Sequence, residues 1–247
     1  MIGKKADGHG DVKQLKWARS SMGHEKEIAE GIYIIGGPSI THAEDAASFI
    51  VDCGQELVMI DSGAGGTSHL LVDNIESLGL NPQSLSTLIL THCHIDHIGS
   101  APYFSDRYGC TLIIHDLDAD AVERGDPVAT AANLYGTTFP PTHIDARLTG
   151  DQGTLSFGTD HIHWLHTPGH TPGSLSLYCN RGNKRILFGQ DIHGPFLSSF
   201  GSNIDEWRRS MTKLLELNAD ILCEGHFGIY RSKERVRSYI MDYLKRY

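Results

Sequence analysis

The segment LILTHCHIDHIG, residues 88–99, constrains this chain more than any other stretch. Within six positions it carries His92, His94, Asp96 and His97. They follow an apolar run that predicts a buried strand. The end of a strand holds side chains rigidly and leaves them open to ligands. Because neutral imidazole and carboxylate groups bind first-row metals, the pattern favours a metal site over a solvated histidine-rich turn.

Three later segments repeat this arrangement. His170 follows the apolar stretch IHWL, Asp191 follows RILFG, and His226 follows DILC. A single loop histidine is more often a surface residue than a ligand. The repetition, however, predicts that these side chains meet the 92–97 loop at one edge of the sheets. Asp61, in VMIDSG, follows the same pattern.

The hydrophobic periodicity predicts strands and helices in alternation. Expected strands cover 31–37, 47–53, 56–63, 86–92, 110–116, 154–158, 162–180, 184–193 and 219–228. Expected helices cover 67–79, 98–109, 204–218 and 232–247. Residues 54–55 (Gly-Gln) predict a hairpin between two of the strands. Two mixed sheets covered by helices satisfy this order, in an α/β fold.

The ends and the middle of the chain differ from this pattern. Residues 1–30 are predicted to form an irregular N-terminal arm, and residues 31–247 a single domain. Residues 116–150 carry little strand signal and predict a helical lid inserted over the site. Tyr135 and Phe139 are its candidates for lining a substrate pocket, and the alternative is a plain surface excursion.

The composition excludes several partners. The 247 residues carry a formal net charge of −9, so nucleic acid is not an expected partner. No apolar run is long enough to span a bilayer. No apolar core follows Lys4 and Lys5, so no secretory signal is expected. The five cysteines are scattered without a C-x-x-C pair, which favours a reducing cytoplasm.

Five signatures, in order, resemble those of the metallo-β-lactamase-fold hydrolase superfamily. They are DSG with Asp61, HCHIDH at 92–97, His170, Asp191 and His226. The resemblance covers about residues 31–230. It implies a four-layer αββα sandwich with the site at one edge of the two sheets. It further implies that His92, His94 and His170 hold one metal, that Asp96, His97 and His226 hold a second, and that Asp191 bridges them. Asp61 would orient the ligand loop through hydrogen bonds.

The chemistry of the seven donors agrees with this division. Seven donors are too many for one tetrahedral zinc but suit two ions about 3.5–4 Å apart. A carboxylate has two oxygens, so Asp191 fits the bridging position. Two divalent ions are expected, with zinc favoured and iron or manganese as alternatives.

Departures from the branches of the superfamily narrow the activity. Its β-lactamases generally lack the bridging aspartate, its nucleases are larger and more basic, and its flavodiiron members have a glutamate at the position of His94. Glyoxalase II-like thioesterases and acyl-homoserine lactonases share the ligands. The lactonases place a tyrosine three residues after the bridging aspartate, where this chain has Gly194. His193 is a candidate to replace that tyrosine as a donor to the substrate carbonyl, with a surface histidine as the alternative.

The resulting expectation is a hydrolase of a small ester, thioester or lactone. A hydroxide that bridges the two metals is the expected nucleophile, and Asp96 is a candidate proton shuttle. An alternative is a persulfide dioxygenase with one iron on His92, His170 and Asp191. A non-catalytic metal-binding module is a third alternative. The expected partner is a small-molecule substrate, and no binding to a membrane is expected. A homodimer is a further possibility.

Overall fold

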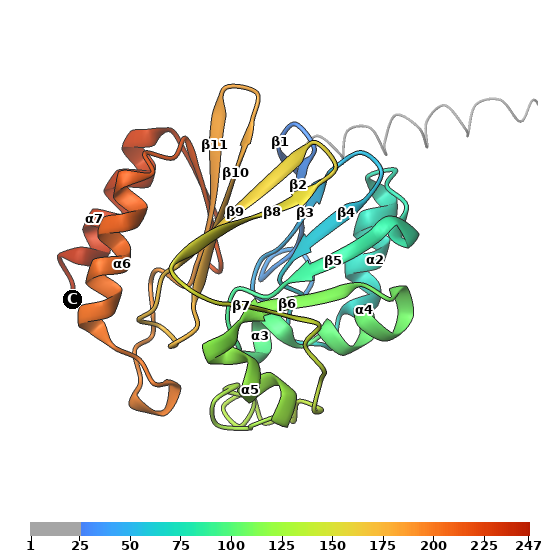
Figure 1. Cartoon of the computed structure of the whole chain (residues 1–247), viewed down its shortest axis with the longest axis horizontal. Helices are drawn as coiled ribbons and strands as arrows, with labels where there is room; N and C mark the ends of the chain where they lie inside the picture. Colours follow the sequence, from blue (N-terminus) through green and yellow to red (C-terminus); the bar gives the residue numbers. More distant parts are fainter. Residues whose placement is uncertain (1–25) are drawn as a thin grey trace, which may run out of the picture.

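A computed structural model describes residues 26–247 and divides them into two β-sheets with helices on both outer sides (Figure 1). The first sheet has the strand order β1(Glu27–Ala29), β2(Ile32–Gly36), β3(Ser48–Asp52), β4(Leu57–Ile60), β5(Leu85–Ile89), β6(Thr111–His115) and β7(Ala146–Leu148). The second has the order β13(Ile229–Arg231), β12(Ile221–Glu224), β11(Lys184–Gln190), β10(Leu175–Arg181), β9(Asp160–His166) and β8(Gln152–Phe157).

Both sheets are mixed. Strands β1 to β4 pair antiparallel, and β4 to β7 pair parallel. In the second sheet only the β11–β12 pair is parallel. The helices are α2(Ser68–Ser77), α3(Ile95–Ile98), α4(Ala101–Tyr108), α5(Asp116–Arg124), α6(Ile204–Glu216) and α7(Lys233–Leu244). The expected αββα sandwich is therefore confirmed, including the hairpin between β3 and β4.

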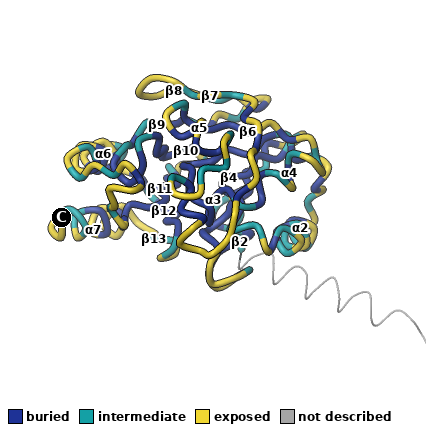
Figure 2. Tube along the Cα trace, turned by 90° about the horizontal axis from the view of Figure 1, so that it is seen from below, coloured by how far each residue is buried: buried dark blue, intermediate teal, exposed yellow. Residues whose placement is uncertain are grey.

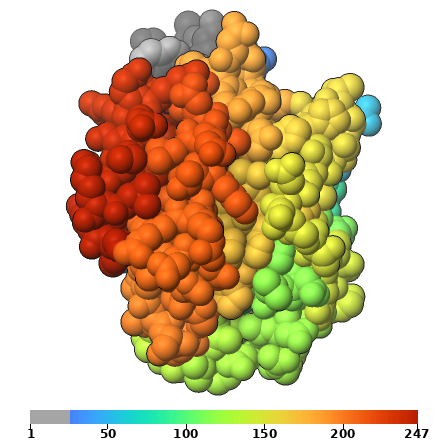
Figure 3. Space-filling model, turned by 60° about the vertical axis from the view of Figure 1, so that its left-hand side comes forward, coloured from blue at the N-terminus to red at the C-terminus, as the bar shows by residue number. Residues whose placement is uncertain are grey.

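Three apolar cores separate the four layers. Alternate residues of a strand point to opposite faces of its sheet. In β3, Ile50 thus packs toward α2, whereas Phe49 packs between the sheets, where it meets Phe188 of β11. The third core lies under α6 and α7, which lie side by side and form one face of the molecule (Figure 3). Buried residues accordingly run through the centre of the trace (Figure 2).

Two predictions about chain organisation were wrong in part. Residues 27–29, assigned to an irregular arm, form strand β1 against β2. The segment 116–150, read as lacking strands, ends in β7, which extends the first sheet beside β6. Both strands have only three residues, too few for a periodic pattern. Residues 1–25 lie outside the described part of the chain. Between residues 26 and 247, no helix is long and apolar enough to cross a membrane.

Phe139 is a core residue, so the prediction that it lines a pocket was wrong. Its side chain is 4 % exposed and packs in the core between the first sheet and its helices.

Replacing this ring should therefore cost stability. We expect Phe139→Ala to lower the free energy of unfolding by about 3–5 kcal/mol, as for other buried aromatic rings. Leu134→Ala is the matched control, because Leu134 lies in the same segment and is 63 % exposed. This substitution should change the free energy of unfolding by less than about 0.5 kcal/mol. Urea denaturation of both variants measures the difference. Equal small effects would place the Phe139 ring outside the core.

Candidate metal centre

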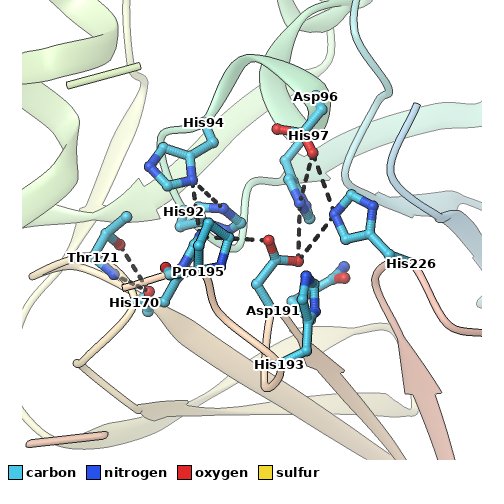
Figure 4. A network of polar contacts seen from close by, with 12 residues as sticks. His92, His94, Asp96, His97, His170, Thr171, Asp191, His193, Pro195 and His226 are labelled. Carbon is cyan, nitrogen blue, oxygen red and sulfur yellow. Dashed lines mark hydrogen bonds and ion pairs between the residues drawn. The ribbon is translucent and has the colours of Figure 1, made fainter. Parts of the chain in front are cut away.

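The structure brings all seven predicted donors together at one edge of the two sheets (Figure 4). His92 and His94 follow β5, and the short helix α3 carries Asp96 and His97. The other three lie just after strands β9, β11 and β12: His170, Asp191 and His226. The side chain of His226 is 21 % exposed, and the other six residues are buried. Their assignment as metal ligands stays a prediction.

Three imidazoles and one carboxylate oxygen form the first group. His94 Nδ1 lies 3.1 Å from His92 Nε2 and 2.9 Å from His170 Nε2. The Oδ2 atom of Asp191 lies 3.4 Å from His170 Nε2. A tetrahedral ion with bonds of about 2.0–2.1 Å keeps its ligand atoms about 3.3–3.4 Å apart. The first group is therefore close to the size that such an ion requires.

The second group uses the other oxygen of Asp191. Its Oδ1 atom lies 3.2 Å from His97 Nε2 and 3.3 Å from His226 Nε2. Asp96 Oδ2 lies 3.2 Å from His226 Nε2 and 3.6 Å from His97 Nε2. These four atoms again have the spacing of a tetrahedral ligand set. Asp191 therefore offers one oxygen to each group.

Outer hydrogen bonds set the tautomers of the imidazoles. His97 Nδ1 donates to the Asp61 carboxylate over 2.7 Å, and His170 Nδ1 donates to the Pro195 carbonyl over 2.8 Å. Since each Nδ1 carries the proton, each neutral ring keeps a lone pair on Nε2, facing the other donors. Such outer partners orient metal-binding histidines and raise their basicity. Asp61 thus contacts His97 in the loop that the family resemblance implied it would orient, and that role stays a prediction.

The protonation states differ between the two groups. Burial lowers the pKa of His92, His94 and His170, so these imidazoles stay neutral. Burial opposes the charge on His226 too, but the Asp191 and Asp96 carboxylates raise its pKa to about 10. The second group is thus a cluster of imidazolium–carboxylate pairs. A divalent cation bound there would replace the protons.

Two further features fit a bound cation. His97 Nε2 and Asp191 Oδ1 are buried and lie 3.2 Å apart as an ion pair, but neither makes a well-aligned hydrogen bond to any described residue. Buried polar atoms normally have a partner, and a cation would supply one. The residue before His226 is Gly225, and a Cβ atom there would lie 2.6 Å from Asp191 Oδ1. The chain thus keeps this space free of side-chain atoms.

Sequence reasoning missed two buried carboxylates that shape the site. Asp118, on α5, accepts hydrogen bonds from the backbone of Cys93 and Gly173 and from the Thr171 hydroxyl, which ties the 92–94 loop to the His170 loop. Glu224, at the end of β12, accepts from His193 Nδ1 over 2.8 Å. Neither carboxylate lies in a pattern that indicates its partners, because those partners come from distant segments.

A cavity of about 310 Å³ is lined in part by Tyr135, whose hydroxyl interacts with the Asp96 carboxylate of the second group. Its lining includes Glu44, Thr67 and Tyr135. Burial, and next the Asp96 carboxylate, raise the pKa of Tyr135, so its hydroxyl stays protonated beside Asp96. The structure thus places Tyr135 where a substrate pocket was predicted, although that role stays a prediction.

Comparisons with known proteins place the chain in a family. Residues 44–226 match the metallo-beta-lactamase superfamily. The chain is 26 % identical over 260 residues to the probable metallo-hydrolase YflN of Bacillus subtilis, covering 93 % of this chain and 91 % of that protein. It is 27 % identical over 249 residues to the acyl-coenzyme A thioesterase MBLAC2 of Gallus gallus, covering 90 % and 86 %.

A solved structure agrees in fold. The subclass B3 metallo-beta-lactamase BJP-1 of Bradyrhizobium japonicum superposes with a TM-score of 0.75 at 18 % sequence identity, covering 89 % of this chain and 90 % of that one. The resemblance inferred from the five sequence signatures is thereby confirmed at the level of the superfamily. From the fold, the seven clustered donors and these matches, the chain belongs to the metallo-beta-lactamase superfamily.

Proposed function

We propose that this protein is a hydrolase with two metal ions, which cleaves a small ester or lactone. Membership of the superfamily supports a metal-dependent hydrolase. The observation that carries the two-ion proposal is the pair of donor groups that share Asp191, one carboxylate oxygen to each. Zinc suits the four-donor spacing and the mixture of imidazole and carboxylate.

The residues divide the work of hydrolysis. The first group would hold one ion on His92, His94 and His170, and the second group the other on Asp96, His97 and His226, with Asp191 between them. Two such ions supply a nucleophilic hydroxide at neutral pH and polarise the substrate carbonyl. Asp61 holds the His97 ring in the tautomer that leaves Nε2 free. Tyr135 is positioned to contact the substrate beside Asp96.

The loops around the site favour an uncharged substrate. Hydrogen bonds link these loops to one another, for example Ala47 N to the Gly225 carbonyl at 2.7 Å and Asn203 N to the Gly169 carbonyl at 2.9 Å. These loops comprise residues 37–47, 61–67, 125–145, 167–174, 191–203 and 225–228. None of these described residues is a lysine or an arginine. Recognition of phosphate or carboxylate tails normally uses such cations. A substrate with the several phosphates of a coenzyme A thioester therefore fits this entrance poorly.

Apolar side chains occur in the same loops. Leu134 is 63 % exposed and Phe227 is 57 % exposed. The Phe200 ring packs on His94 with centroids 4.2 Å apart. Together with the absence of lysine and arginine from these described loops, the apolar surfaces favour a neutral ester or lactone with an apolar acyl part. The similarity to a coenzyme A thioesterase supports the transfer of an acyl group to water. It does not by itself support coenzyme A as the leaving group.

The single-iron alternative has less support. It uses only His92, His170 and Asp191, whereas His94 Nδ1 lies within 3.1 Å of both other imidazole nitrogens. It also leaves the second group of donors without a role. The geometry therefore supports hydrolysis over oxygen chemistry.

A substrate panel tests the proposed function. The zinc-loaded protein is offered three compounds whose acyl parts have the same number of carbons: a neutral ester, a lactone and a coenzyme A thioester. We expect kcat/KM for the neutral compounds to exceed that for the coenzyme A thioester by at least about tenfold. Turnover of the thioester alone would contradict the substrate assignment, and turnover of none of the esters, lactones or thioesters would contradict the hydrolase.

A further inference from the structure

The buried Glu224 and the partly buried His193 form a pair at the edge of the candidate metal centre. The Glu224 side chain is fully buried, and its Oε1 atom lies 2.8 Å from His193 Nδ1. One ring nitrogen of His193 lies within 4.8 Å of donor atoms of both Asp191 and His226. The His193 ring is 16 % exposed, so it has little contact with bulk water.

The other oxygen of Glu224 has a separate task. Its Oε2 atom accepts the backbone N–H groups of His226 at 2.7 Å and Phe227 at 2.8 Å. Glu224 therefore fixes the turn that carries His226 and, with the same carboxylate, the ring of His193. A carboxylate with three such donors is held in one orientation, so it cannot rotate to accommodate the other tautomer of His193.

This contact decides which nitrogen of His193 carries the proton. A carboxylate can only accept, so His193 Nδ1 must donate. In the neutral ring, Nε2 then has a lone pair and no hydrogen. Asp61 has the same effect on His97, and the Pro195 carbonyl on His170. A neutral His193 held in this way cannot donate a hydrogen bond to a substrate oxygen, which is the role considered from the sequence.

We propose that Glu224 is a positioning residue that locks His193 in the Nδ1–H tautomer, so that His193 Nε2 accepts a hydrogen bond from the hydrolytic water. The inference rests on the proposed hydrolase function for the role of the water, but the tautomer itself does not depend on turnover. Orienting the attacking water beside Asp191 would align it with the substrate carbonyl.

Histidine-selective ¹⁵N NMR measures the tautomer directly, in the metal-free and the zinc-loaded protein. The His193 signals are assigned by their loss in His193→Phe. At a pH where the ring is neutral, we expect the proton on Nδ1 in the wild type. In Glu224→Gln, the amide group can donate to Nδ1, and we expect the proton to move to Nε2. A wild-type proton on Nε2, or an unchanged tautomer in Glu224→Gln, would overturn the proposal.

Kinetics separate positioning from a structural role. We expect Glu224→Gln to lower kcat by about 10–100-fold, by analogy with the loss of outer partners of metal-bound histidines, with KM and zinc content near wild type. Glu216→Gln, an amide substitution on helix α6, is the matched control and should keep full activity. If Glu224→Gln keeps wild-type kcat despite a moved proton, His193 has no role as an acceptor. If no variant and no wild type hydrolyses any ester, the NMR result still tests the tautomer.

Discussion

Asp191→Asn is expected to lower kcat/KM by more than about a hundredfold and to leave the chain with at most one tightly bound ion. Asp191 supplies one oxygen to each donor group, at 3.4 Å from His170 Nε2 and 3.2 Å from His97 Nε2. Asparagine keeps the size but has no charge and only one oxygen that can bind a cation. The loss should exceed the 10–100-fold effect typical of outer partners of a ligand, because Asp191 is itself in contact with both groups.

Metal analysis and steady-state kinetics on the same sample check this prediction. Asp242→Asn, the same chemical change on the surface of α7, is the control and should change neither quantity. An Asp191→Asn protein with two ions per chain and full turnover would remove Asp191 from the site.

Asp61→Asn should weaken binding of an ion to the second group by about 10–100-fold. Asp61 is fully buried, and its Oδ2 atom accepts hydrogen bonds from His97 Nδ1, the Thr91 hydroxyl and Gln190 Nε2. An amide NH₂ group at the position of Oδ2 cannot accept hydrogen bonds from these donors. The proton of the His97 ring is then no longer fixed on Nδ1. The backbone at residue 61 has φ = 55°, which asparagine tolerates, so the change acts through the side chain.

Zinc titration of the metal-free protein measures this affinity. Asp145→Asn is the control, since Asp145 accepts a hydrogen bond from the backbone of Leu112 instead of a site imidazole. Equal zinc affinity in wild type and Asp61→Asn would mean that the Asp61–His97 contact does not orient the ring for metal binding.

The sequence predicted most of the site because its donors follow recognisable apolar strands. The strands β11 and β12 are parallel neighbours in the second sheet and β5 lies in the first, so the pattern of an apolar strand followed by a donor indicated that Asp191, His226 and His92 meet at one edge of the two sheets. The same periodicity predicted two sheets, because alternating buried faces need cover on both sides. Short elements such as β1 and β7 were missed, since three residues carry no period.

Contacts between distant segments could not be predicted in the same way. Glu224 and His193 are 31 residues apart, and Asp118 and Gly173 are 55 apart. Each pair depends on the final packing of separate loops. Phe139 was placed in the lid because its neighbours contain little strand signal, yet the packing of that segment turns its ring into the core. Sequence patterns indicate which elements form, whereas the direction of a loop side chain is set by tertiary packing.

We propose that this chain holds two metal ions that share Asp191 and that both ions are needed for ester hydrolysis. The most direct test is a titration of the metal-free protein with zinc, in which bound metal and ester or lactone turnover are followed together. We expect two ions to bind per chain, with full activity reached only as the second ion binds. Saturation at a single ion per chain, with full activity at that point, would contradict this proposal.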